Sequence, residues 1–519
     1  MDFDEVNNYG PAWSGETIKL IANNEPDKAM ARAKDAFVQC LRSGDVKGKV
    51  IALLLLAKVH LALQEPLDAL DVGERALAEL LRNPDAFVEG ACMHTIAKCN
   101  KELCRFTDAL ELAQEAIRKF REAGSKVGEA NVLNTMARIN LARGRRHDCV
   151  KLAKQARALF RAAEERHGES EALHFLVRGS LALNRKEEAL KLAKEMSALH
   201  EANDLEKQGV AQLVTVDVLC DMEDYDEATE VATKVVEMFD MTHKSLQAQA
   251  TRRLADVCFA KGDDSDGWMY AKEALELYRS VGHCKGEAEM LLEITKAHFS
   301  SAGGQEGLLI AEEGIKLCRE ANFRKTLGDL LLATARGRLA MESAGFAQEQ
   351  HLNYKARQGG KEALTVYQEI GDLKGQLNAH NTLAMGFMAY GNVAEGKARA
   401  RRAVEIAQML GDKTAEGANL LLVAQCRFHD NKEEAARLAS LASRLLRDGG
   451  DRKTMEEAGP VISAIQEDGE EKKDKEKRGA GASLAETMAS KMDLTLDFDD
   501  MKTRAIYFWG FTSRAARAM

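Results

Sequence analysis

Small residues return along this chain at a nearly constant interval. Each is followed four residues later by a second small residue, and all 22 positions hold Ala, Gly or Cys. Consecutive pairs are 39 or 40 residues apart, with one interval of 49. The first members, called anchors below, are Ala29, Ala69, Ala109, Cys149, Ala189, Ala228, Gly267, Gly307, Ala356, Gly396 and Ala435. The second members are Ala33, Gly73, Ala113, Ala153, Ala193, Ala232, Ala271, Ala311, Gly360, Ala400 and Ala439. A fixed period of this length is the mark of a repeat architecture.

The repeating unit has the pattern of two helices joined by a turn. The clearest example predicts one helix from about Gly128 to Leu141 and a second from about His147 to Phe160. The anchor lies near the start of the second helix, where a small side chain lets a neighbouring helix approach closely. Residues that tolerate a left-handed backbone conformation recur at the corresponding turns. They are Gly144, Asn184, Asp224, Gly262, Gly303, Gly391 and Asn431.

Composition supports helix throughout the periodic region. The chain has five prolines, and none of them lies between Pro84 and Pro460. Aromatic residues make up 5% of the sequence, which is rich in Ala, Leu, Glu, Lys and Arg. We therefore expect an all-α fold, a right-handed α-solenoid of about eleven helix–turn–helix units over residues 11–447.

The positions of small residues in many units resemble those of the tetratricopeptide repeat family. Small residues lie at the anchor, seven positions after it and twelve positions before it, as in Ala69, Ala76 and Ala57. Several first helices open with Gly-Glu-Ala or Gly-Glu-Ser, at Gly128, Gly168 and Gly286. With its period near 40 residues the pattern is similar to the repeats of Pins-type polarity adaptors and of rapsyn. It departs from the family in having Ala or Gly where the second helix usually carries an aromatic residue. The resemblance implies a protein-binding superhelix whose first helices line a concave groove.

A row of basic residues falls on those first helices. Four cations lie eleven positions before successive anchors, at Lys58, Lys98, Arg138 and Arg178. Polar residues lie one turn earlier, at His94, Asn134 and His174. The charge then reverses at Asp217 and Asp256. On the face that the resemblance assigns to the groove, such a row suits an extended acidic peptide, because each cation can form a charge-assisted hydrogen bond with a carboxylate. The alternative is that these are ordinary solvated positions of a helix. The family's carboxylate clamp for chaperone tails has Asn where this row has Lys or Arg, which argues against chaperone tails as ligands.

Two segments interrupt or follow the repeats. The interval of 49 residues places an insertion near Met341–Leu352, which we interpret as a surface loop, with a partner-specific protrusion as the alternative. Residues 448–482 include a mixed-charge run and are expected to be a flexible linker.

The last segment, residues 483–519, combines acidic and aromatic residues in one motif. Acidic and apolar residues alternate near Asp493, and a short aromatic cluster surrounds Trp509. The motif residues are Asp493, Asp497, Phe498, Asp499, Asp500 and Trp509. Three interpretations stay open: the tail docks into the groove of its own chain as an autoinhibitory plug, caps the last repeat, or docks on another protein.

Several function classes are excluded or disfavoured. The sequence contains no P-loop, no HExxH and no GxSxG motif, and its ten cysteines form no CxxC pair, so we expect no enzyme, metal or cofactor. The net charge of −9 argues against a general nucleic-acid binder. No apolar run is long enough to span a membrane, and the acidic N-terminal residues do not resemble a secretory signal. These features predict a cytoplasmic scaffold or adaptor that binds extended, acidic peptide segments. The alternative is a structural subunit of a large cytoplasmic or cytoskeletal assembly, including a ciliary or trafficking one.

Overall fold

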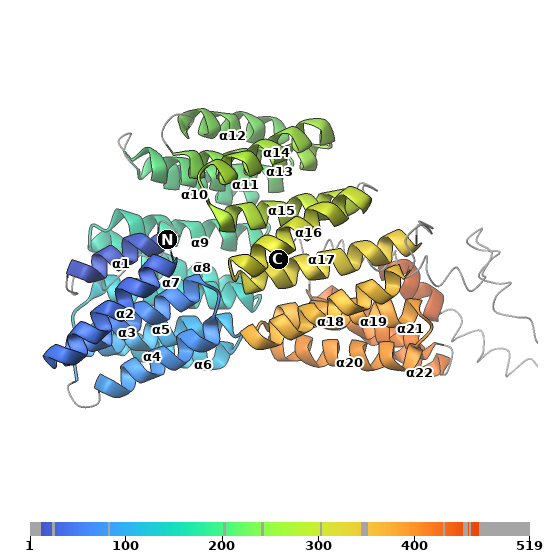
Figure 1. Cartoon of the computed structure of the whole chain (residues 1–519), viewed down its shortest axis with the longest axis horizontal. Helices are drawn as coiled ribbons and strands as arrows, with labels where there is room; N and C mark the ends of the chain where they lie inside the picture. Colours follow the sequence, from blue (N-terminus) through green and yellow to red (C-terminus); the bar gives the residue numbers. More distant parts are fainter. Residues whose placement is uncertain are drawn as a thin grey trace, which may run out of the picture. The chain divides into compact units, whose positions relative to one another are not determined.

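The computed structural model describes residues 12–22, 26–80, 84–200, 204–239, 243–300, 304–343, 351–428, 431–449, 455 and 458–466 (Figure 1). These residues form helices joined by short turns, and no strand occurs among them. The chain divides into two compact units, Met1–Met290 and Leu291–Met519, with the division inside α15. The predicted tail motif and much of the predicted insertion lie outside the described residues.

The helices follow the predicted alternation. Unit 1 contains α1 (Ala12–Ala22), α2 (Pro26–Ser43), α3 (Val46–Ala62), α4 (Pro66–Leu80), α5 (Ala86–Glu102), α6 (Phe106–Glu122), α7 (Lys126–Ala142), α8 (Arg146–Ala162), α9 (Arg166–Ala182), α10 (Lys186–Ala198), α11 (Leu205–Met222), α12 (Tyr225–Phe239), α13 (Lys244–Lys261), α14 (Asp264–Ser280) and the start of α15 (Cys284–Ser300). Unit 2 contains the rest of α15, α16 (Gly304–Glu320), α17 (Arg324–Ser343), α18 (Leu352–Ile370), α19 (Leu373–Ala389), α20 (Val393–Leu410), α21 (Lys413–Arg427) and α22 (Lys432–Gly449).

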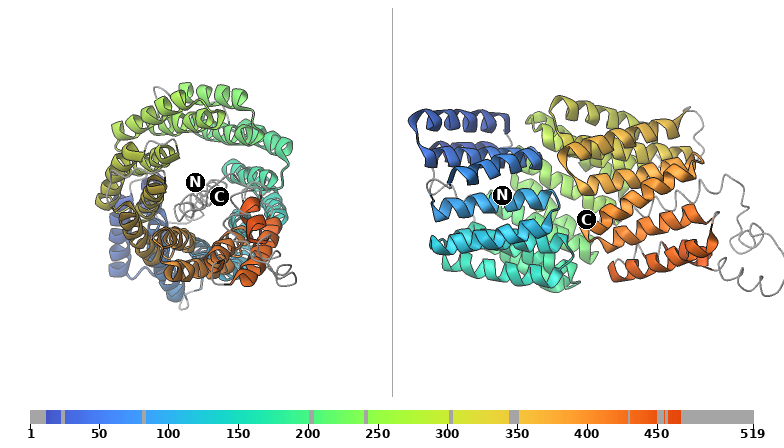
Figure 2. Two further views of the ribbon diagram at one scale, coloured as in Figure 1. Left: turned by 90° about the vertical axis from the view of Figure 1, so that its right-hand side faces the viewer. Right: turned by 90° about the horizontal axis from the view of Figure 1, so that it is seen from below.

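Successive helices pair as antiparallel hairpins, and the hairpins stack within each unit (Figure 2). The odd-numbered helix is the first of each hairpin. First helices also pack on the first helices of neighbouring hairpins, as α7 does on α9, α11 on α13, and α17 on α19. Direct contact between first helices makes them the inner layer of each unit, with the even-numbered helices outside them.

The small residues lie where the sequence period predicts. All 22 are buried, and each lies in an even-numbered helix, from Ala29 in α2 to Ala439 in α22. A side chain at Gly73 would meet Ile96 of α5, with a Cβ-to-Cγ1 distance of 3.1 Å. The sequence period therefore arises from the close packing of one hairpin on the next. A larger residue at these positions would leave no room for the neighbouring helix.

Aromatic residues occupy a place that the sequence pattern did not assign to them. They lie eleven residues after an anchor, in the last turn of the second helix, as Phe120 and Tyr278 do. The ring of Phe120 lies where a side chain of Gly128 would be, and Tyr278 lies in the same way against Gly286. The glycines that open several first helices are therefore required by a ring from the preceding helix.

The predicted turns are mostly confirmed. Gly144, Asn184, Gly262 and Gly391 have positive φ angles between 58° and 92°. Asp224 does not adopt this conformation, which belongs to Glu223 at φ 66°. Asp224 instead accepts a 3.3 Å hydrogen bond from the Glu227 amide, so it caps the following helix. Asn431 has the same capping role, accepting a 3.0 Å bond from the Glu434 amide, and Gly303 lies outside the described residues.

Two structural details revise the predicted segment boundaries. At the insertion, Met341 and Leu352 are helical and buried, at 6% and 3% exposure, in a cluster with Phe299 and Leu308. The insertion thus begins and ends in the core of unit 2. Within the predicted linker, residues 458–466 are helical instead of flexible.

The helix at 458–466 forms because its apolar residues share one face. Ala458, Ile462 and Ile465 are spaced by four and three, and all are buried in one cluster with Leu446 of α22. The Gln466 side-chain amide also donates a 2.9 Å hydrogen bond to the Ser440 hydroxyl. This segment therefore covers part of the last hairpin, the capping role that one interpretation gave to the tail.

Candidate functional site

The predicted groove residues lie on first helices of unit 1, whereas the tail motif lies outside the described residues. Lys58 lies on α3, His94 and Lys98 on α5, Asn134 and Arg138 on α7, and His174 and Arg178 on α9. These four helices pack directly on one another in sequence order. Residues at one register position of consecutive helices therefore follow each other along the inner layer.

His94 is a structural tie between two helices. It is buried at 3% exposure, and its Nε2 atom lies 2.7 Å from the Thr135 hydroxyl of α7. A buried imidazole hydrogen-bonded in this way fixes the register of α5 against α7. We therefore infer that His94 positions the helices that carry the basic residues and does not contact a ligand directly.

Asn134 has the opposite character. Its side chain is only 4% exposed, yet neither its amide nitrogen nor its amide oxygen has a hydrogen-bond partner among the described residues. A buried amide without partners costs free energy, on the order of 1–3 kcal/mol. Such a group beside the row would be stabilised by a partner that supplies both a donor and an acceptor.

The two arginines control the electrostatics of the row. The Arg138 guanidinium lies over the Phe175 ring at 5.2 Å from its centroid, and Arg178 is exposed. Burial, together with the charges of Arg178 and Arg138, lowers the pKa of His174 to about 4. His174 is therefore neutral at pH 7, and the positive charge in this part of the row belongs to the arginines.

The reversal of charge is present in the structure. Arg253 of α13 lies 3.5 Å from Asp217 of α11 and 3.5 Å from Asp256. Burial raises the pKa of the Asp217 carboxyl, while the nearby Arg253 and Arg178 oppose that rise. The inner layer thus passes from cations on α3 to α9 to a mixed cluster on α11 and α13.

Sequence reasoning missed a second polar group, on first helices of unit 2. Asn381 of α19 donates a 2.8 Å hydrogen bond to the Asn419 side chain of α21, and its own oxygen has no partner among the described residues. Arg336 of α17 donates a 3.0 Å bond to the Thr382 hydroxyl. Asn381 lies fifteen residues before its anchor Gly396, the same offset that separates Asn134 from Cys149. This shared offset from the anchor is the sequence signal that would have predicted Asn381.

The buried cysteines do not have the character of nucleophiles. All ten are free thiols, and seven are buried. Burial raises the pKa of Cys99 to about 12 and that of Cys149 to about 11. Thiols of this kind are protonated at neutral pH and unreactive.

The architecture follows from the stacked hairpins and from the small residues buried between them. The hairpins have the helix–turn–helix architecture that the resemblance to tetratricopeptide repeats implies. In the described part of these repeats, no helix combines the length and the apolar character that a bilayer crossing requires.

Comparisons with known proteins give structural matches only. No family model and no curated protein matches the sequence of the repeats. One similar solved structure is a Rap protein complexed with competence and sporulation factor, at 13% identity and TM-score 0.43, covering 77% of this chain and 97% of that one. Another is a signal transduction ATPase with a tetratricopeptide repeat sensor from Pyrococcus horikoshii, at 14% identity and TM-score 0.44, covering 76% of this chain and 55% of that one. A third is a kinesin light chain with TPR-like repeats from Podosopora anserina, at 16% identity and TM-score 0.30, covering 36% of this chain and 92% of that one.

Proposed function

We propose that this chain is a protein-interaction scaffold, and not an enzyme, whose unit 1 binds an extended acidic peptide along its inner layer. The observation that carries the proposal is the cation row, in which Lys58, Lys98, Arg138 and Arg178 occupy one register position on four consecutive first helices. A carboxylate at each cation forms a charge-assisted hydrogen bond, about twice as strong as a neutral one.

The spacing of the row defines the ligand further. Packed helices lie about 8–10 Å apart, and an extended peptide advances about 3.3 Å per residue. Neighbouring cations therefore meet every third residue of the peptide. Because Asp217 and Asp256 follow Arg178, basic peptide residues belong at that end, which gives the bound chain one direction. The backbone N–H and C=O groups of such a peptide match the unpartnered amide of Asn134, which would have to turn out of its buried position to bond them.

Binding of a designed peptide tests the proposal. A labelled peptide with Asp at every third position and Lys at one end is titrated against the full chain, and fluorescence anisotropy gives the affinity. A peptide of the same composition in scrambled order is the control ligand. Arg178→Glu is expected to weaken the phased peptide by tenfold or more, while Lys154→Glu on the exposed side of α8 leaves its affinity unchanged. The affinity should also fall with added salt.

Equal affinity for the phased and scrambled peptides would contradict the proposed groove. Failure of both peptides to bind would favour the alternative function, a structural subunit of a larger assembly.

The tail provides a candidate ligand within the same chain. Asp497 and Asp500 are three residues apart, as are the positions that neighbouring cations would contact. We propose that residues 483–519 compete with external peptides for the cation row. Removing them is expected to raise the affinity for the phased peptide. An unchanged affinity would leave two interpretations of the tail, a cap on the last repeat and docking on another protein.

We also propose a cytoplasmic location. The described residues contain no disulfide, and buried thiols such as Cys99 and Cys318 have pKa values raised to about 12. Free buried thiols are typical of proteins in reducing compartments. Fluorescence microscopy of the tagged chain, with separate markers for cytosol and secretory lumen, would decide the location.

A further inference from the structure

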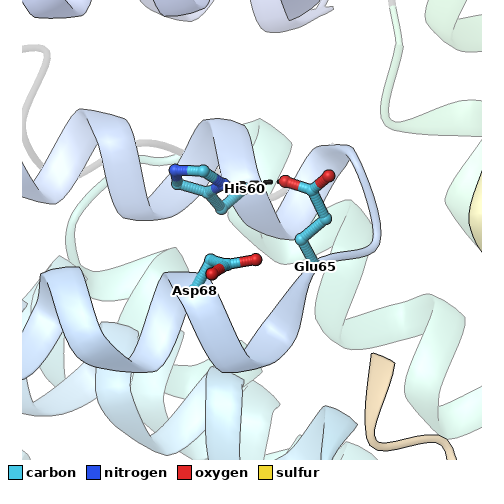
Figure 3. Close-up of side chains that lie close together, drawn as sticks. All are labelled: His60, Glu65 and Asp68. Carbon is cyan, nitrogen blue, oxygen red and sulfur yellow. Dashed lines mark hydrogen bonds and ion pairs between the residues drawn. The ribbon is translucent and has the colours of Figure 1, made fainter. Parts of the chain in front are cut away.

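The turn between α3 and α4 brings three metal-ligating side chains together (Figure 3). His60 lies in the last turn of α3, Glu65 directly precedes α4, and Asp68 lies in the first turn of α4. One donor atom from each lies within 4.8 Å of the other two. The Nδ1 atom of His60 is already 2.8 Å from a Glu65 carboxylate oxygen. His60 and Glu65 are half-buried, and Asp68 is exposed.

The backbone of the turn is fixed by its own hydrogen bonds. The Glu65 amide donates a 2.9 Å bond to the His60 carbonyl, and Gln64 adopts a left-handed conformation at φ 62°. The same bond and the same conformation recur in the turns of the next three hairpins, with left-handed residues at Cys104, Gly144 and Asn184. The four turns are therefore structurally equivalent, and their side chains can be compared position by position.

Only the first of these four turns carries the three ligands. The position of His60 holds Asn100, Asn140 and Ser180 in the other turns, and the position of Glu65 holds Arg105, Arg145 and Arg185. An acid is kept at the position of Asp68, as Asp108, Asp148 and Glu188. In the fourth turn the arginine offsets that acid, with Arg185 3.5 Å from Glu188. In the first turn, Glu65 replaces the arginine and adds a second negative charge beside Asp68.

The carboxylates of Glu65 and Asp68 have one basic partner, His60, within the described residues. Within the described residues, no Lys or Arg forms an ion pair with Glu65 or Asp68, and His60 is the one basic group hydrogen-bonded to either. Two carboxylates this close repel each other. A bound cation removes this repulsion. The repulsion arises because the first turn has glutamate where the other three turns have arginine.

We propose that His60, Glu65 and Asp68 bind a zinc ion. Zinc accepts imidazole nitrogen and carboxylate oxygen at about 2.0–2.2 Å, and three protein ligands with one water form a common zinc site. An imidazole ligand disfavours magnesium and calcium, which prefer oxygen alone. Tetrahedral ligands lie about 3.3 Å apart at these bond lengths, so rotation of the exposed Asp68 side chain closes the site. The Nδ1 proton of His60 leaves to solvent, and coordination replaces its hydrogen bond to Glu65. The sequence-based expectation of no metal rested only on the absence of cysteine pairs and of linear metal-binding motifs, so it did not address a site of this kind.

A zinc titration of the full chain with a competing fluorescent chelator tests the site. The wild-type chain is expected to bind one molar equivalent more than Glu65→Arg, which restores the residue of the neighbouring turns. Asp68→Asn, at an exposed position, is expected to weaken that equivalent by about tenfold or more. The ten cysteines are common to all variants, so zinc bound by thiols cancels in the comparison.

A transplanted site provides the matched control. Asn100→His combined with Arg105→Glu places the same three residue types in the next turn, because Asp108 is already present. This double variant is expected to gain one zinc equivalent over the wild type. The proposal is overturned if wild type, Glu65→Arg and Asp68→Asn bind zinc with the same stoichiometry and affinity, since the zinc would then be adventitious.

Discussion

The phenol of Tyr367 donates a 2.6 Å hydrogen bond to a carboxylate oxygen of Asp329. Tyr367 lies in the last turn of α18 and is fully buried, and Asp329 lies on α17, in the same hairpin. The Tyr367 ring also lies where side chains of Gly328 on α17 and Gly375 on α19 would be. One residue thus joins three consecutive helices of unit 2.

Removing the Tyr367 hydroxyl should destabilise unit 2. Tyr367→Phe keeps the ring but leaves the partly buried Asp329 carboxyl without this donor, at an expected cost of about 1–3 kcal/mol of unfolding free energy. Urea denaturation followed by circular dichroism measures the change. Tyr354→Phe is the control, because Tyr354 is 56% exposed and its hydroxyl should contribute little.

The glycine beneath the ring should be equally constrained. Gly375→Ala puts a methyl group into the space of the Tyr367 ring, and overpacking of this kind costs about 1–3 kcal/mol. Gly459→Ala provides the opposite control, because nothing lies within 4 Å of a side chain there and Ala favours helix by up to about 1 kcal/mol. If both variants moved the denaturation midpoint in the same direction, the packing of Tyr367 on Gly375 would be wrong.

An anchor-pair residue should tolerate no larger side chain. Ala153 of α8 has no exposed surface, so Ala153→Leu must displace a neighbouring helix and is expected to lower stability by about 1–3 kcal/mol. Its neighbour Lys154 is exposed, and Lys154→Ala should leave the melting temperature unchanged. Equal melting temperatures for the two variants would show that the helix register is wrong.

A network of charges joins three helices in unit 1. Glu169 on α9 accepts hydrogen bonds from Arg157 and Arg161 on α8, and both arginines also bond Glu195 on α10. Because Glu169 is only 6% exposed, Glu169→Gln should cost about 1–3 kcal/mol. The exposed pair of Glu115 and Arg118 is the control, and Glu115→Gln should cost less than about 0.5 kcal/mol. Calorimetric melting of the two variants distinguishes them.

His174 should make stability depend on pH. Its pKa falls from 6.5 to about 4 on folding, so below pH 6.5 the unfolded chain binds a proton that the folded chain does not. Stability is therefore lost as pH falls from about 6.5 towards 4, by an amount on the order of 3 kcal/mol. Asp217 has the opposite effect, because its raised pKa favours the folded state at low pH.

A comparison of variants isolates the contribution of His174. The difference in unfolding free energy between wild type and His174→Gln is measured in urea at pH 7.5 and at pH 5. The wild type should lose more stability than the variant between these two values. A difference that stays constant would show that His174 is protonated equally in both states.

The sequence predicted the helical hairpins well because the constraint is steric and periodic. Every unit has small residues at the positions equivalent to Cys149 and Ala153, and all of these small residues are buried in the structure. The cation row also followed from register alone, since Arg138 and Arg178 lie at equal offsets on first helices that pack together. Whether this row binds acidic peptides stays a prediction.

Other features needed three-dimensional information. The role of His94 depends on the Thr135 hydroxyl, 41 positions away along the chain, and no pattern within one helix shows it. The helix at 458–466 has only three buried apolar residues, too short a stripe to stand out beside a charged run. The cluster at His60 combines residues from both sides of a turn, so that no linear motif marks it.

The helix at 458–466 bears on how such an array ends. A stack of identical hairpins presents at its last member the same apolar surface that it buries between members, and that surface invites another hairpin, including one from a second chain. Ala458, Ile462 and Ile465 occupy part of that surface on the last hairpin, where they share a cluster with Leu446. That part of the surface is therefore closed to a further hairpin while the short helix is in place.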